Sequence, residues 1–159
     1  MRWLILVSLV TAGCGSKGDQ ASPRGVAEGL AAAMDRGDAE LGQRLIAPEN
    51  KLRDAFDCGS SDRLAHATAR AREELRLAYE ELRATGVRVR LARMDEPGSE
   101  TTALAAGDVW RDCAARRAIE VHRARLTLVY RKGARDDEDQ ERWDFIRFGP
   151  DEPWWYVPK

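Results

Sequence analysis

The sequence has few of the residues that most often carry out catalysis or bind metal ions. It contains only two histidines and three cysteines in 159 residues, and it has no Cys-x-x-Cys pair that would suggest a zinc site. It also lacks a Gly-x-Ser-x-Gly nucleophile motif, a His-Glu-x-x-His zinc motif and a phosphate-binding loop. Its motifs therefore identify no catalytic residue, no cofactor and no metal site.

The sequence also has no excess of charge of one sign and no long apolar run. The 26 basic and 27 acidic residues leave a formal net charge of -1, without the basic surplus that binding to nucleic acid requires. The longest apolar run starts at Trp3 and is roughly half as long as the ~20 residues that a membrane-spanning helix needs. We therefore expect neither a nucleic-acid partner nor a transmembrane anchor.

The apolar run has the layout of an export signal. Arg2 precedes it, and the small residues Ala12 and Gly13 lead to Cys14. This arrangement resembles the lipobox of bacterial lipoproteins, although Thr11 stands where that family most often has Leu. The resemblance implies that residues 1–13 are a signal peptide and that Cys14 is lipidated. An ordinary secretory signal and a buried N-terminal strand are the alternatives.

Residues 14–22 are interpreted as the lipidated cysteine and a flexible, Gly- and Ser-containing tether, followed by a single domain at 23–159. Two or more acyl chains hold a protein stably at a bilayer, so the expected partner is a membrane, bound through the lipid on Cys14. Because Gly15 rather than Asp follows Cys14, the lipoprotein resemblance favours the outer membrane of the cell envelope, on the side that faces the periplasm.

Two cysteines, Cys58 and Cys113, are left once Cys14 is assigned to the lipid. An exported domain enters an oxidising compartment, where a pair of cysteines favours a disulfide. A metal site or a reactive thiol has no supporting pattern around either residue. We expect the bond to stabilise the fold by about 4 kcal/mol.

The N-terminal half of the domain predicts helices. Ser22 and Asp38 are suitable caps for two of them, and Pro48 for a third. The longest helical pattern runs from a cap at Ser61 to Gly86. Its narrow apolar stripe is expected to pack on a sheet, and consists of Leu64, Thr68, Ala71, Leu75, Ala78 and Leu82.

The C-terminal half changes to the alternating pattern of strands. Strands are predicted over 87–93, 101–105, 109–113, 118–131, 143–148 and 154–157. In the long run 118–131, Val121 falls on the face opposite Ala124, Leu126 and Leu128, which predicts a β-bulge near His122. The highly charged run 131–142 predicts a solvated hairpin loop.

Helices followed by antiparallel strands predict an α+β fold, with N-terminal helices packed on a curved antiparallel sheet. The phrase Arg36–Glu40, the long C-terminal strands and the closing Trp155-Tyr156-Val157 resemble the NTF2-like (SnoaL-like) family, with its cystatin-like cone. The chain also resembles small bacterial lipoproteins that share a helical and a strand cysteine. That second likeness implies that Cys58 ties the helical layer to the sheet at Cys113.

An NTF2-like cone would arrange side chains of the strand half around a cavity. The candidates for its wall are Trp110, His122, Trp143, Asp144, Phe145, Trp155 and Tyr156. Core packing is the alternative for each aromatic residue, and a structural role is the alternative for His122. The other histidine, His66, is expected on the surface.

Two functions are consistent with these features. The favoured one is a non-enzymatic binding module for a protein partner or a small ligand beside the membrane. The alternative is an NTF2-like enzyme acting on a small apolar substrate, which would need a carboxylate buried inside the cone. A purely structural envelope component is also compatible with the sequence.

Overall fold

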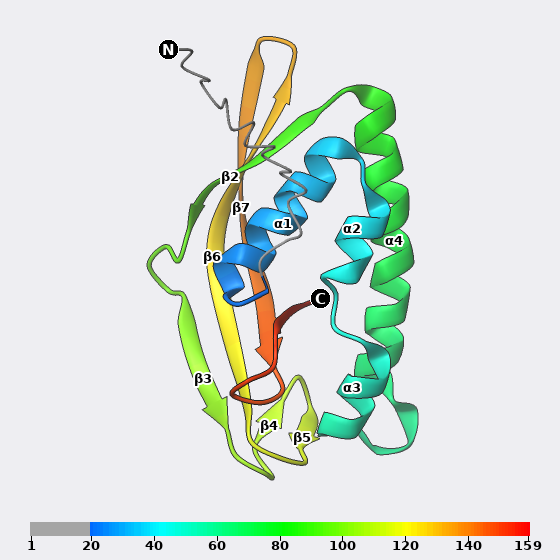
Figure 1. The fold of residues 1–159 in the computed structure, drawn as a ribbon, viewed down its shortest axis with the longest axis vertical. Coiled ribbons are helices and arrows are strands. Elements are labelled where there is room, and N and C mark those ends of the chain that lie inside the picture. Colours follow the sequence, from blue (N-terminus) through cyan, green and yellow to red (C-terminus); the bar gives the residue numbers. More distant parts are fainter. Residues whose placement is uncertain (1–19) are drawn as a thin grey trace, which may run out of the picture.

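A computed structural model describes residues 20–159, so the predicted signal peptide and Cys14 lie outside the described residues. The fold is α+β, as expected, with helices packed against antiparallel sheets (Figure 1). Within residues 20–159, no helix is both long and apolar enough to cross a membrane.

The four helices begin and end close to their predicted caps. They are α1 (Pro23–Arg36), α2 (Ala39–Arg44), α3 (Glu49–Ala55) and α4 (Arg63–Thr85). The Ser22 hydroxyl accepts a hydrogen bond from the Gly25 amide at 3.0 Å, and Asp38 accepts one from the Leu41 amide at 2.9 Å. Ser61 does not cap α4, because it lies in a short 3-10 turn and Asp62 takes the N-cap position.

The strands of residues 20–159 form two antiparallel sheets. The larger has the order β2-β6-β7-β8, with β3 paired to β6, and the smaller has the order β1-β5-β4. The larger contains β2 (Arg88–Met94), β3 (Glu100–Leu104), β6 (Ile119–Lys132), β7 (Arg135–Arg147) and β8 (Trp154–Val157). The smaller contains β1 (Phe56–Asp57), β4 (Val109–Trp110) and β5 (Cys113–Ala115).

The pairing of β6 with β7 keeps one register from Glu120–Arg147 to Lys132–Arg135. The predicted bulge near His122 is therefore wrong, and the register shift lies in β2, between Leu91 and Arg93. The buried face of β6 changes along the strand for a different reason. One sheet face packs on α1 and α2, whereas the other packs on the small sheet and α3, so each face has its own core.

The two cores share β6 and β7 between them. Leu126, Leu128 and Phe145 point into the first, together with the apolar side of α1. Val121 and Ile146 point into the second, together with side chains of the small sheet. Alternate residues of one strand pair thus stabilise both cores.

The long helix α4 was expected to pack on the sheet, but it packs mainly on the other helices. Its main neighbours are α1, α2 and α3, and Figure 1 shows it along the outer side of the helical layer. The stripe is buried at Leu64, Thr68 and Ala71. Towards the C-terminal end Leu75 is only half-buried and Ala78 is exposed.

Two predicted segments differ in detail from the structure. The charged run 131–142 is solvated, but as a continuous strand ladder that turns only at Gly133 and Ala134. Cross-strand charge pairs such as the bidentate Arg131–Asp136 contact accompany this ladder. The predicted strand 109–113 is instead the β4–β5 hairpin, since Arg111 and Asp112 both have positive φ and form its turn.

The disulfide between Cys58 and Cys113 is confirmed. Cys58 follows β1 and lies across from Cys113, continuing the register in which Phe56 pairs with Ala115 and Asp57 with Ala114. The bond therefore ties the chain just after α3 and β1 to strand β5 of the small sheet.

Removing this bond should destabilise the fold by about 4 kcal/mol, because it closes a loop with a sequence separation of 55. The measurement is urea unfolding of the wild type with and without reductant, beside the double variant Cys58→Ser/Cys113→Ser. The reductant should lower the stability of the wild type to that of the double variant and leave the double variant unchanged. Equal stability of all samples would contradict the expectation.

Candidate functional site

A large cavity lies between the C-terminal half of α4 and the large sheet, beside the end of α1. Its volume is about 630 Å³, within the range of pockets that hold small ligands. It is lined by Leu30, Met34, Leu75, Ala78, Tyr79, Glu81, Leu82, Thr85, Val87, Tyr130, Lys132, Glu141, Trp143 and Tyr156. Apolar and aromatic side chains make up most of this wall.

The strand register places the sheet side of the wall. Tyr130 of β6, Glu141 and Trp143 of β7 and Tyr156 of β8 all share the sheet face of Leu126 and Phe145. Residues of one face recur at every second position, so Glu141 and Trp143 stand next to each other on that face.

On the helix side, Tyr79 of α4 is buried and reaches across α2. Its ring passes so close to Gly42 that a Cβ atom built there would lie 2.0 Å from a ring carbon. Only glycine at this position lets the ring pass. A larger residue at position 42 would displace Tyr79 and change the wall of the cavity.

The cavity wall has few polar groups, and most of them belong to aromatic side chains. The carboxylate of Glu141 accepts hydrogen bonds from the Tyr130 hydroxyl at 3.3 Å and from Nε1 of Trp143 at 2.6 Å. The Trp143 and Tyr156 rings lie 5.2 Å apart, centroid to centroid. Within the described residues, the hydroxyls of Tyr79 and Tyr156 form no hydrogen bond, and both side chains line the cavity.

Burial raises the pKa of Tyr79, Tyr130 and Tyr156 above the ordinary value for tyrosine. It is the largest cause for each of them, and the negative charge of Glu141 adds to it at Tyr130 and Tyr156. All three hydroxyls are therefore neutral near pH 7, and each can both donate and accept a hydrogen bond.

Of the residues predicted from the sequence to line a cavity, Trp143 and Tyr156 do so here. Phe145 lies on the same sheet face but is fully buried in the first core. Trp110 and Trp155 pack with the second core, on the opposite side of the sheet. Tyr79 and Glu141 were not among the candidates, although Glu141 precedes Trp143 by two residues, which in a strand places both on one face.

His122 is placed away from the cavity, where it connects three segments. Its Nε2 lies 2.7 Å from a carboxylate oxygen of Asp95, and its Nδ1 lies 2.7 Å from the hydroxyl of Thr101. Its ring also packs near Phe145 and Trp154. His122 thereby holds β3 and the turn before it against β6. His66 is exposed, as expected.

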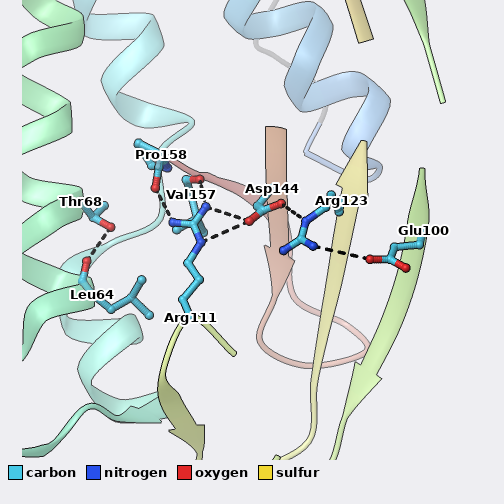
Figure 2. A network of polar contacts seen from close by, with 8 residues as sticks. All are labelled: Leu64, Thr68, Glu100, Arg111, Arg123, Asp144, Val157 and Pro158. Atoms are coloured by element: carbon cyan, nitrogen blue, oxygen red, sulfur yellow. Dashed lines mark hydrogen bonds and ion pairs between the residues drawn. The ribbon is translucent and has the colours of Figure 1, made fainter. Parts of the chain in front are cut away.

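Asp144 is buried, on the sheet face opposite the one that lines the cavity. One carboxylate oxygen accepts from Arg111 at 2.8 Å, and the other accepts from Arg123 at 3.0 Å (Figure 2). Arg111 also donates to the carbonyl groups of Val157 and Pro158. The Asp144 carboxylate raises the pKa of Arg123, so this network consists of stable ion pairs.

Within residues 20–159, no group of three or more His, Cys, Asp or Glu side chains is arranged to hold a metal ion. Comparison with known proteins found no matching protein family, no matching curated protein and no matching solved structure.

The tyrosines allow a direct test of how dry the cavity wall is. A raised pKa means that the folded state favours the neutral hydroxyl, so this contribution to stability is complete below the unfolded pKa of about 10 and is lost as the pH rises above it. In an ultraviolet absorbance titration, we expect no phenolate until the chain unfolds at alkaline pH. In denaturant all three tyrosines should titrate near their ordinary pKa; a tyrosine that does so in the folded chain would contradict the expectation.

The ion pairs of Asp144 with Arg111 and Arg123 should stabilise the fold. The substitution Asp144→Ala leaves two guanidinium groups without their carboxylate, and should lower the free energy of unfolding by about 3 kcal/mol. The control is Asp137→Ala on the same strand, which removes an exposed pair with Arg135 and should cost under about 0.5 kcal/mol. Urea unfolding measures both, and equal effects would contradict the assignment.

Proposed function

We propose that this protein binds a small, largely apolar ligand in the cavity between α4 and the large sheet. The observation that carries the proposal is the cavity of about 630 Å³, walled by leucine, methionine and aromatic side chains. Cavities of this size that are walled mainly by apolar and aromatic side chains, with a few polar groups, are typical binding sites for small ligands. A cavity of this size and shape favours a small ligand over a protein partner.

The chemistry of the wall favours binding over catalysis. The Glu141 carboxylate already accepts hydrogen bonds from two aromatic residues, and the raised pKa of each tyrosine makes it a poor acid near pH 7. The enzyme alternative called for a buried carboxylate inside the cone. Asp144 is buried, but it lies on the other sheet face and forms ion pairs with Arg111 and Arg123.

We further propose that the domain is NTF2-like and acts at the cell envelope as a lipoprotein. Support comes from the lipobox-like residues around Cys14 and from a disulfide that suits an oxidising compartment. The carbonyl of Gln20 accepts a hydrogen bond from the Trp154 amide at 2.8 Å, so the domain is held from Gln20 onward. The six Cα–Cα steps from Cys14 to Gln20 would span at most about 20 Å, which would keep the domain beside the bilayer.

Filling the cavity tests the binding proposal. The probe is N-phenyl-1-naphthylamine, an apolar dye whose fluorescence rises on transfer from water, added to the full chain with Cys14→Ser. We expect saturable binding that Ala78→Trp weakens by about tenfold or more, because an indole ring would occupy the space of the ligand.

The matched control is Leu77→Trp, one residue away on the same helix. Leu77 is 52% exposed and does not line the cavity, so this variant should bind the dye as well as the wild type does. Equal affinity of the Ala78→Trp and Leu77→Trp variants would overturn the proposal, and a circular-dichroism melt of each would show whether the variant is folded.

A further inference from the structure

We infer that the ligand of this cavity is an organic cation with an apolar body, such as an amine or a quaternary ammonium group joined to a hydrocarbon chain. The inference rests on the proposed function and adds the chemical class of the ligand. It is carried by three features of the wall: a carboxylate without a cationic partner, aromatic rings around it, and an acidic balance of charge.

The carboxylate is that of Glu141. Within residues 20–159 it takes part in no ion pair, and its hydrogen bonds come from the neutral Tyr130 and Trp143. By contrast, Asp144 lies on the opposite face of the same strand and forms ion pairs with two guanidinium groups. The half-buried carboxylate of Glu141 thus has no arginine or lysine partner in the described part of the chain, although the chain is rich in arginine. Its negative charge can therefore pair with a cationic ligand.

The aromatic rings supply the second feature. Trp143 and Tyr156 pack 5.2 Å apart, and Tyr79 and Tyr130 line the same cavity. The π-face of an aromatic ring attracts a cation, and the attraction grows when the cation is desolvated. A cation among these rings would therefore gain both from the rings and from the Glu141 charge.

The balance of charge at the cavity points the same way. The charged residues that line it are Glu81, Lys132 and Glu141, and Asp139 is near enough to raise the pKa of Tyr130. Lys132 is exposed close to the tip of the β6–β7 hairpin. An anion would be repelled by these carboxylates, and a neutral ligand would bury the Glu141 charge without compensation.

The apolar part of the wall sets the rest of the ligand. Leu30, Met34, Leu75 and Leu82 surround the part of the cavity on the helix side. These side chains offer no charge and match a hydrocarbon body. The ligand class is then a cation at one end, beside Glu141, and an aliphatic or aromatic body at the other.

The experiment compares three probes of equal chain length by isothermal titration calorimetry on the full chain with Cys14→Ser. They are decyltrimethylammonium, 1-decanol and decanoate, each below the concentration at which it aggregates. We expect the cation to bind about tenfold more tightly than the alcohol, and decanoate to bind most weakly. Equal binding of the cation and the alcohol, or tighter binding of decanoate, would overturn the inference and leave the proposed function standing.

A pair of variants assigns the preference to its residue. Glu141→Gln keeps the size of the side chain and removes its charge, so the cation should then bind within about twofold of the alcohol. Glu138→Gln removes the same charge from the opposite face of the same strand and should keep the preference of the wild type. A preference that survives Glu141→Gln would overturn the inference, and failure of all three probes to bind the wild type would overturn the proposed function with it.

Discussion

The unshifted pairing of β6 with β7 is the constraint on which the rest of the structure depends. Because side chains alternate across a strand, this one register sends Phe145 and Trp143 towards the helices and Ile146 and Asp144 towards the small sheet. It therefore builds two cores from a single strand pair. It also separates two acidic residues, placing Glu141 at the cavity and Asp144 in an arginine network on the opposite face.

The cavity lies where three elements meet without filling the space between them. The helix α4 spans Arg63–Thr85, and Leu75 and Leu82 in its second half are half-buried. They line the cavity together with Leu30 and Met34 of α1 and with the aromatic side chains of the sheet. Tyr79, which passes over Gly42, closes the floor of the resulting space. The fold thus keeps an apolar space that its own side chains do not fill.

Much of this fold could be predicted from local sequence signals. The caps Ser22 and Asp38 and the glycine after α1 fix helix ends through hydrogen bonds within a few residues. The disulfide was expected because two cysteines follow residues that resemble an export signal. The bulge was wrongly placed near His122, because a change of buried face has the same pattern whether the strand is bulged or has a separate core on each side. Glu141 was missed because it sits in a charged run whose other residues are solvated, and only the long-range register shows that it faces the cavity.

The central claim, that the cavity between α4 and the sheet holds a small apolar ligand, is tested most directly by native mass spectrometry of the protein purified from cells that express it. We predict that the wild type carries a bound small molecule that is released on denaturation, and that the Ala78→Trp variant, whose cavity is filled, does not. The same adduct on both proteins, or its absence from the wild type, would contradict the account.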